Sequence, residues 1–407
     1  MQENNHKERG LLAGVRILEL ASVVAGPFAA SMLADFGAEV IKVELPGQGD
    51  AIRYSGVRKN DVSLWWKVSG RNKKNITLDL RHPKGQEICK KIVAQSDALI
   101  ENFRPGTLEK WNLGWEDLQR INPSLIMLRI SGYGQTGPYS PRPGFGKAAE
   151  AMSGVMQITG YPDEQPISPG FSFADTVSGL MGAFAVMTAL HHRDGLGARK
   201  GQLIDVALFE SIYRLIEWQV IFFDQLGVIP TRRGAKMGLP GSSWLINNYP
   251  TKDGKWVAVS ASNRQVLNRV LKLIGGENLL ADERFNGEQV FRHMDELDVI
   301  TADWIREREC KDVIQSFVDA GAVAAPVYDI RDIFHDEQYA ARDDILEMED
   351  EELGRIRMLG VIPKFPQRPG QIRWTGKEMG FFNREIYCDL LGMSLEELAS
   401  LKAEGIV

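Results

Sequence analysis

Cysteine and histidine are scarce in this sequence. Its 407 residues include three cysteines, Cys89, Cys310 and Cys388, which lie far apart in the chain. This spacing excludes the dense disulfide framework of small secreted proteins and provides no CxxC pair for a metal ion. The six histidines form no ligand pattern either, because His191 and His192 are adjacent and a helix would point them in different directions. We therefore expect no metal site.

Long apolar runs and an excess of positive charge are also absent. The longest apolar run, LMGAFAVMTAL at 180–190, has 11 residues, whereas a membrane-spanning helix needs about 20. The N-terminal segment MQENNHKERG is polar and precedes no apolar core of a secretion signal. The formal net charge of -6 provides no basic field for nucleic acid or anionic lipid. The sequence therefore predicts a cytoplasmic protein that binds neither nucleic acid nor membrane.

The first half of the chain alternates strand-like and helix-like segments. GVRILEL reads as a strand and is followed by a helix that Pro27 opens and Gly37 ends. NITLDL repeats the pattern, with a helix opened by Pro83, and DALIENF and LIMLRIS are two more strands. Such alternation is typical of an α/β fold with a doubly wound parallel sheet.

The pattern changes near residue 230, and a chain of this length is expected to form two domains. WLINNYPTKDGKWVAVSAS predicts a hairpin that turns at Asp253 and Gly254. Helices at 263–274, 292–306 and 310–320 complete a smaller α+β domain. We predict a large domain at 1–200, a linker at 201–235, a small domain at 236–330, and a return segment with C-terminal helices at 331–407.

The glycine motifs of the common doubly wound enzymes are missing. A dinucleotide site needs G-x-G-x-x-G in the first strand-to-helix turn, but this turn reads ASVVAGPFAAS and has one glycine. The chain also lacks a P-loop and a G-x-S-x-G nucleophile elbow. The turn still brings backbone amides to a helix start, where an anion or a developing oxyanion can bind. A plain structural turn is the alternative.

Basic residues gather in two loops beside predicted strands. Arg71, Lys73 and Lys74 come just before one strand, whereas Arg104 and Lys110 follow another. Ligands of doubly wound sheets bind at the carboxyl ends of the strands, and basic side chains there suit a phosphorylated ligand. Solvated surface charge is the alternative.

Asp175 is a lone carboxylate ahead of the most apolar helix, in the segment SPGFSFADTVSGLMGAFAVMTAL. One interpretation is structural, since an aspartate before a helix caps its free N–H groups. The other is catalytic: a helix N-terminus keeps a carboxylate ionised and nucleophilic, and Ser178, Gly179 and Gly182 leave room for a ligand. Composition does not decide between these two interpretations.

Taken in order, several motifs resemble the class III CoA-transferases of the CaiB/BaiF type. They are GVRILELASVVAGPFAASMLADFGAEVIKVE, GDAIR, RNKKNITLDL, ENFRPGTL, INPSLIMLRISGYGQTGP, ADTVSG and GQLIDVALFES, with AGAVAAPVYDI further on. The resemblance implies a Rossmann-like large domain and a homodimer of two interlocked rings. It also implies an enzyme that moves CoA from an acyl-CoA donor to a free carboxylic acid, with CoA as substrate and no permanently bound cofactor.

The same resemblance identifies Asp175 as the nucleophile. Its carboxylate attacks the donor thioester to give an aspartyl anhydride, which CoA thiolate converts to an aspartyl-CoA thioester. The family's CoA contacts fall on two groups of residues here. The turn residues Val23, Val24 and Ala25 lie at the pantetheine and thioester end. The remaining expected contacts are Asn102, Phe103, Arg104 and Lys110, with Arg71, Lys73 and Lys74 at the phosphate and adenine end.

Departures from the family pattern bear on the substrate. Val24 and Leu45 replace a glutamine and an arginine of formyl-CoA transferases, and the glycine-rich lid is reduced to 236–243, which argues against a formyl or oxalate substrate. A succinyl-CoA donor with a dicarboxylate acceptor is the expected class. One alternative is the family's 2-methylacyl-CoA racemase branch, which needs two bases, yet Phe145 stands where racemases have a histidine. A non-catalytic CoA-binding protein is another, although Asp175 is retained.

Overall fold

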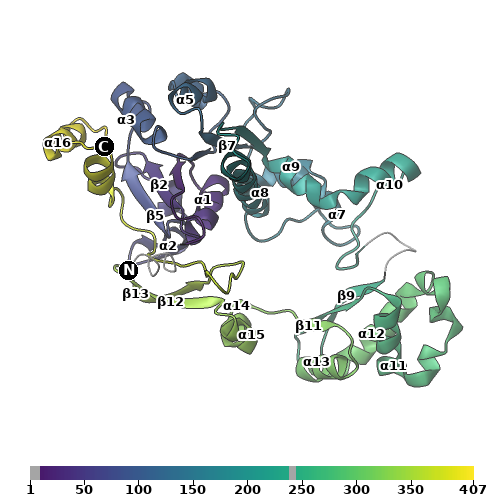
Figure 1. Ribbon diagram of the computed structural model, residues 1–407. Coiled ribbons are helices and arrows are strands. Elements are labelled where there is room, and N and C mark those ends of the chain that lie inside the picture. The colour runs from purple at the N-terminus through teal and green to yellow at the C-terminus, as the bar shows by residue number, and fades with distance from the viewer. Residues whose placement is uncertain (1–9, 238–243) are drawn as a thin grey trace. The chain divides into compact units, whose positions relative to one another are not determined.

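The computed structural model describes residues 10–237 and 244–407, which form two compact units (Figure 1). The first unit combines 1–155, 169–217 and 341–407, and the second combines 156–168 and 218–340. The chain therefore leaves the first unit and returns to it. Residues 1–9, which make up nearly all of the polar N-terminal segment, lie outside the described residues. So do residues 238–243, which are most of the lid segment at 236–243.

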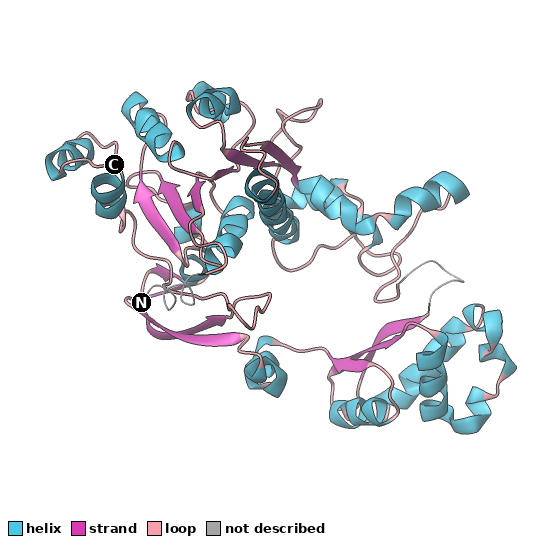
Figure 2. Cartoon of the chain, viewed as in Figure 1, coloured by secondary structure: helices cyan, strands magenta, loops and turns pink. Residues whose placement is uncertain are grey.

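A six-stranded sheet forms the centre of the first unit (Figure 2). Its strands run in the order β5-β2-β1-β6-β7-β8, and every neighbouring pair is parallel. This is the Rossmann order, which reverses direction between β1 and β6 and so creates a ligand-binding crevice at their carboxyl ends. The predicted parallel sheet is confirmed. The strands are β1 (Arg16–Glu19), β2 (Glu39–Glu44), β5 (Lys73–Thr77), β6 (Ala98–Glu101), β7 (Ile126–Ser131) and β8 (Leu203–Ala207).

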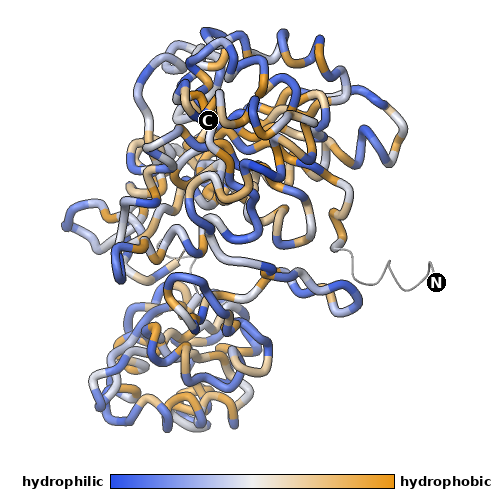
Figure 3. Tube along the Cα trace, turned by 90° about the vertical axis from the view of Figure 1, so that its left-hand side faces the viewer, coloured by the Kyte–Doolittle hydropathy of each residue, from blue (hydrophilic) through white to orange (hydrophobic). Residues whose placement is uncertain are grey.

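Helices cover both faces of this sheet. On one face, α3 (Pro83–Val93) and α5 (Trp115–Ile121) share a core with alternate strand residues such as Leu18, Leu99 and Met127. The C-terminal segment with α16 (Leu395–Ala403) joins the same core. The hydropathy trace shows the hydrophobic segments running through the interior of each unit (Figure 3).

The opposite face carries α1 (Ala25–Asp35) and α8 (Phe173–Leu190), which lie side by side (Figure 1). By length and composition, α8 and its continuation to Gly195 could cross a membrane. It packs instead against β7 and β8, where a Cβ added to Gly182 would lie 2.8 Å from Leu128 Cδ2. One face of this apolar helix therefore packs in the core of the unit, whereas Leu180, Phe184 and Met187 remain exposed.

Shorter elements complete the first unit. They are β3 (Arg58–Lys59), β4 (Val62–Ser63), α2 (Leu64–Ser69), α4 (Thr107–Lys110), α6 (Gly146–Met152), α7 (Val155–Ile158), which runs on into the second unit, α9 (Leu208–Tyr213), β12 (Ile345–Asp350) and β13 (Gly354–Leu359).

The second unit combines an antiparallel sheet with helices. The predicted hairpin is present and turns at Gly254, whose φ of 75° is accessible to glycine. β9 (Leu245–Pro250), β10 (Trp256–Ala261) and β11 (Ala324–Pro326) form an antiparallel sheet. The helices are α10 (Trp218–Leu226), α11 (Arg264–Leu280), α12 (Met294–Arg306), α13 (Cys310–Asp319), α14 (Ile330–His335) and α15 (Glu337–Ala341).

The predicted linker at 201–235 is a point of difference. β8 and α9 belong to the first unit, and α10 belongs to the second. The reason is that the apolar stretch LIDVA pairs with β7 and completes the edge of the sheet. Within this stretch the chain passes from the first unit to the second between Glu217 and Trp218.

Candidate active site

Asp175 lies in the first turn of α8 as its third residue. The residue before the helix, Ser172, makes no side-chain cap, so Asp175 is inside the helix and not at its N-cap. Its carboxylate lies against α6, where a Cβ on Gly146 would be 2.4 Å from Asp175 Oδ2. The glycine at 146 therefore makes the space that this carboxylate occupies.

The surroundings of Asp175 raise its pKa to about 6. Burial has the largest effect, and the negative charge of Glu150 adds to it. Glu150 is itself buried, with 4% of its surface exposed. At pH 7 Asp175 is still mostly ionised, and a carboxylate of raised pKa is a better nucleophile than an ordinary one.

The turn between β1 and α1 lies at the topological switch point of the sheet. Asn102, which follows β6, holds this turn through two hydrogen bonds with Ser22: Ser22 N donates to Asn102 Oδ1 at 2.9 Å, and Asn102 Nδ2 donates to Ser22 O at 2.8 Å. The carboxyl ends of β1 and β6 are thus tied together where the fold predicts a ligand.

Two cavities of the first unit are each lined by residues of this turn, the first by Ser22 and the second by Val23 and Val24. The first, of about 540 Å³, lies along the carboxyl ends of β1, β2 and β5 and is lined by Ser22, Leu45 and Phe103 among others. The second, of about 1140 Å³, is mainly apolar. Its lining includes Val23, Val24, Phe28, Trp65, Phe171, Leu180 and, from the start of α8, Ser172 and Thr176.

Most of the predicted CoA contacts lie at this edge of the sheet. Phe103 lines the first cavity in edge-to-face contact with Trp111, at 5.3 Å between ring centroids. Arg104 and Lys110 are exposed in the segment that follows β6. Ala25 is buried as the first residue of α1.

Arg71, Lys73 and Lys74 lie elsewhere, and their placement does not fit the predicted phosphate contacts. Arg71 precedes β5, and Lys73 and Lys74 are the first two residues of that strand, so all three backbones lie at the amino edge of the sheet, although the side chain of Lys73 extends to Pro27 O beneath the β1–α1 turn. Arg71 borders the second cavity, but each of the three cations is paired with a carboxylate within the unit. The ion pairs are Arg71–Asp35 at 2.5 Å, Lys73–Glu19 at 2.8 Å and Lys74–Glu39 at 2.6 Å.

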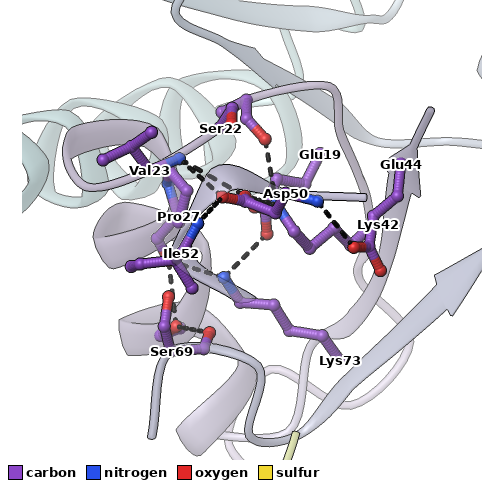
Figure 4. A network of polar contacts seen from close by, with 12 residues as sticks. Glu19, Ser22, Val23, Pro27, Lys42, Glu44, Asp50, Ile52, Ser69 and Lys73 are labelled. Carbon is purple, nitrogen blue, oxygen red and sulfur yellow. Dashed lines mark hydrogen bonds and ion pairs between the residues drawn. The ribbon is translucent and has the colours of Figure 1, made fainter. Parts of the chain in front are cut away.

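A buried charged cluster beneath the turn escaped prediction. It contains Glu19, Lys42, Asp50 and Lys73, all of them less than 5% exposed (Figure 4). The available signal was the position of Lys42 in IKVE and of Asp50 in GDAIR, two of the motifs that carry the family resemblance. Sequence spacing alone did not bring them together, because Glu19, Lys42 and Lys73 lie on three different strands and Asp50 follows one of them.

Comparisons with known proteins agree with this arrangement. Residues 12–380 match the family model described as CoA-transferase family III. A succinyl-CoA–D-citramalate CoA-transferase of Chloroflexus aurantiacus is 42% identical over 399 residues, which cover 97% of this chain and 98% of the relative. The beta subunit of a succinyl-CoA–L-malate CoA-transferase from the same organism is 38% identical, with 97% and 98% covered.

A solved structure agrees as well. The crystal structure of a CAIB/BAIF family protein from Brucella suis is 29% identical, with a TM-score of 0.81 over 94% of this chain and 100% of that one. The chain thus combines a turn at the switch point of the sheet with Asp175 at the start of α8. The same chain matches this family along most of its length. The chain belongs to CoA-transferase family III.

Proposed function

We propose that this CoA-transferase moves CoA from succinyl-CoA to a dicarboxylate, with Asp175 as the covalent nucleophile. The observation that carries the proposal is the position of Asp175: a partly buried carboxylate with a pKa of about 6, against Gly146 at the start of α8. The names of the two relatives support the substrate class, since both include succinyl-CoA and a hydroxylated dicarboxylate.

The first half of the reaction loads CoA onto the enzyme. An oxygen of Asp175 attacks the thioester carbonyl of succinyl-CoA, and cleavage of the C–S bond leaves a succinyl-aspartyl anhydride and CoA thiolate. The thiolate then attacks the aspartyl carbonyl, releases succinate and forms an aspartyl-CoA thioester. The free energy of the thioester bond is retained in each intermediate, provided that water is excluded.

The second half repeats these steps with the acceptor. A carboxylate of the dicarboxylate attacks the aspartyl-CoA thioester and gives a second anhydride with release of CoA thiolate. The thiolate attacks the acceptor's carbonyl, which forms the new acyl-CoA and frees Asp175. No net proton transfer occurs, so the reaction requires no general acid.

Each tetrahedral intermediate carries an oxyanion that needs hydrogen-bond donors. The N-cap of α1, Val24, makes no side-chain cap, and the first amides of a helix have no intrahelical acceptor. We assign the oxyanion to these amides at Ala25 and Gly26. A Cβ on Gly26 would lie 2.3 Å from Ala21 Cβ, so this close turn accepts only glycine.

CoA is proposed to enter along the carboxyl edge of the sheet. The thioester end lies near Val23 and Val24, and the remainder follows the first cavity past Phe103. Arg104 and Lys110, which are exposed beside it, supply positive charge for the phosphates.

The proposed assembly is a cytoplasmic homodimer of interlocked chains. Support comes from α10, which has no buried residue and presents Val220, Ile221, Phe223 and Leu226 to solvent. Such an apolar helix needs a covering surface. Pairing with a different subunit is the competing assembly, because one relative is named as a beta subunit.

The deciding experiment incubates the protein with succinyl-CoA and a panel of free acids, without ATP, and measures new acyl-CoA by mass spectrometry. We expect products from C4 and C5 dicarboxylates and none with Asp175→Ala. Hydroxylamine should trap the aspartyl adduct on the peptide that contains residue 175. Turnover by Asp175→Ala above a few per cent would reject the nucleophile.

The racemase alternative has a different signature. It would exchange the α-hydrogen of a 2-methylacyl-CoA with deuterium from solvent and leave the free acids unchanged. The side chain at the position of the racemase histidine is Phe145, which is 76% exposed and has no proton to exchange. We expect no such exchange.

A further inference from the structure

The turn between β1 and α1 contains a strained residue. Val23 has a φ of 68°, in the left-handed region that a β-branched side chain rarely adopts. Such a conformation is energetically costly and persists only where surrounding contacts enforce it. Val23 lines the same cavity as the start of α8. The contacts that hold Val23 in its left-handed conformation therefore also affect the active site.

Asp50 makes the enforcing contact. Its carboxylate accepts the Val23 N–H, with N–O distances of 3.1 Å to Oδ1 and 3.3 Å to Oδ2. It also accepts the Ile52 N–H at 3.0 Å and pairs with Lys42 Nζ at 2.7 Å. Although burial acts to raise it, the charge of Lys42 and the two backbone donors hold the pKa of Asp50 at about 2. The carboxylate is therefore ionised across the working pH range.

The cations around Asp50 hold the residues on both sides of the turn (Figure 4). Lys42 Nζ donates to Ala21 O at 2.9 Å, just before the turn, and to Glu19 at 2.8 Å. Lys73 Nζ donates to Pro27 O at 2.7 Å, just after it, and pairs with Glu19 as well. The last residue before the turn, the strained residue and the first turn of α1 are thus attached to one ionic cluster.

The turn is also in contact with the helix that carries Asp175. A Cβ on Gly179 would lie 2.7 Å from Ala25 O, and Gly179 is one helical turn beyond Asp175. A change in the backbone at Val23 therefore moves the start of α1 relative to the nucleophile. A buried ionic cluster is a costly way to stabilise a fold, since well-packed apolar residues often serve as well.

We propose that Asp50 is a positioning residue for CoA transfer: it holds Val23 in its left-handed conformation and thereby fixes the start of α1 beside Asp175. This inference rests on the proposed function for its effect on turnover. The structural part of the inference, that the Val23 backbone conformation depends on the Asp50 carboxylate, is independent of the proposed function.

The test compares Asp50→Asn and Asp50→Ala with a matched control, Asp350→Asn. Asp350 is likewise buried in the first unit and pairs with Lys67 at 2.9 Å, but it makes no contact with the turn. The asparagine at 50 keeps the shape of the side chain but has one oxygen for three donors. We expect kcat with succinyl-CoA to fall about 10- to 100-fold in both Asp50 variants. The control should lose thermal stability with kcat within about twofold of the parent protein.

Rescue separates positioning from general damage. Glycine adopts a positive φ without strain, so Val23→Gly in the Asp50→Ala background should restore kcat by about tenfold. Failure of this rescue, or an equal loss of kcat in Asp350→Asn, would overturn the proposed role.

A crystal structure of Asp50→Ala provides a test that does not depend on activity. We expect Val23 to leave the left-handed region, and an unchanged φ would overturn the inference. If the parent protein transfers no CoA, or if Asp175→Ala remains active, the proposed function fails. The conformation of Val23 still decides whether Asp50 controls the turn.

Discussion

Two features of Asp175 act on its pKa in opposite directions. Its place in the first turn of α8 favours the charged form, whereas burial and the neighbouring Glu150 favour the protonated form and prevail. The ionised carboxylate of Asp175 is therefore less stabilised by its surroundings than an ordinary carboxylate in water. A carboxylate in this state is suited to attack on a thioester carbonyl. The raised pKa should affect both the pH dependence of the rate and the pH dependence of the stability, and both can be measured.

The rate should depend on the protonation of Asp175. In the proposed mechanism only the ionised carboxylate of Asp175 attacks, so we expect kcat/KM to be constant above pH 7 and to fall tenfold per pH unit well below pH 6, following the pKa of about 6. Glu150→Gln removes a negative neighbour and should move the midpoint to lower pH. A profile that is flat down to pH 5, or a midpoint that Glu150→Gln leaves unchanged, would contradict this account of the site.

The raised pKa of Asp175 should also make the free energy of unfolding depend on pH. The folded state holds the Asp175 proton more tightly than the unfolded chain, so stability falls as pH rises from about 4 to about 6 and the loss is complete at pH 7. Asp175→Asn removes this loss. We expect a gain of about 1–2 kcal/mol in the free energy of unfolding at pH 7, after allowance for the partial exposure of the group. Urea titration at pH 7 measures it, and the gain should be absent at pH 4.

Gly146 offers a local test of the geometry. A methyl group there would lie 2.4 Å from the Asp175 carboxylate and displace it. Gly146→Ala should lower kcat by about 100-fold, as expected for a misplaced reacting group, and leave CoA affinity within about twofold in calorimetry. A variant of normal activity would show that the carboxylate does not react from this position.

Among the secondary-structure elements, the site depends most on the close packing of α1 and α8. Gly179 allows the Ala25 carbonyl to approach α8, and Gly182 allows Leu128 of β7 to do so. These two small residues explain why an apolar helix of this length lies flat against the sheet. They also bring its first turn to the switch-point turn.

Gly179→Ala tests this packing, because the sign of its effect on the free energy of unfolding shows whether helix propensity or the close contact dominates. Helix propensity alone predicts that alanine stabilises an internal helical position by about 1 kcal/mol. The Cβ would lie 2.7 Å from a backbone oxygen, so we expect a net loss of about 1–3 kcal/mol in urea unfolding. Gly170→Ala, where nothing lies within 4 Å, is the control and should be nearly neutral. A more stable Gly179→Ala protein would refute the close contact.

For the molecule as a whole, the open question is what covers the apolar surface of α10. None of its residues is buried, which is unusual for a helix containing valine, isoleucine, leucine and phenylalanine. The proposed homodimer would bury it.

Charge on α10 should therefore weaken assembly. We expect sedimentation of the parent protein as a dimer and a shift to monomer in the double variant Ile221→Asp and Phe223→Asp, whose side chains are 58% and 60% exposed. The double variant Lys311→Glu and Gln315→Glu, at exposed positions of α13, is the charge control and should remain a dimer. A parent protein that sediments as a monomer would reject the homodimer, and recovery with a second, different chain would favour a two-subunit enzyme.

Local pattern was sufficient for much of the fold. The alternation of strands and helices predicted the parallel sheet, because hydrophobic periodicity is a local property of the chain. The hairpin at Gly254 was predicted for the same reason. The predicted linker at 201–235 was wrong because the strand at 203–207 pairs with β7 and so belongs to the sheet of the first unit, which the local pattern does not reveal. The basic residues at 71–74 were predicted as phosphate contacts, but Arg71, Lys73 and Lys74 lie at the start of β5 and pair with carboxylates that only the fold brings to them.

The amino-acid sequence was enough to identify the family, the doubly wound sheet and Asp175 as the candidate nucleophile, since ordered motifs and periodicity are readable without coordinates. Only tertiary contacts determine which charges are free and which are paired internally. Glu19, Lys42, Asp50 and Lys73 are far apart in the chain, and their pairing depends on the strand order that brings β1, β2 and β5 together. The raised pKa of Asp175 and the strain at Val23 have the same origin, because burial and enforced backbone angles arise only when distant segments pack.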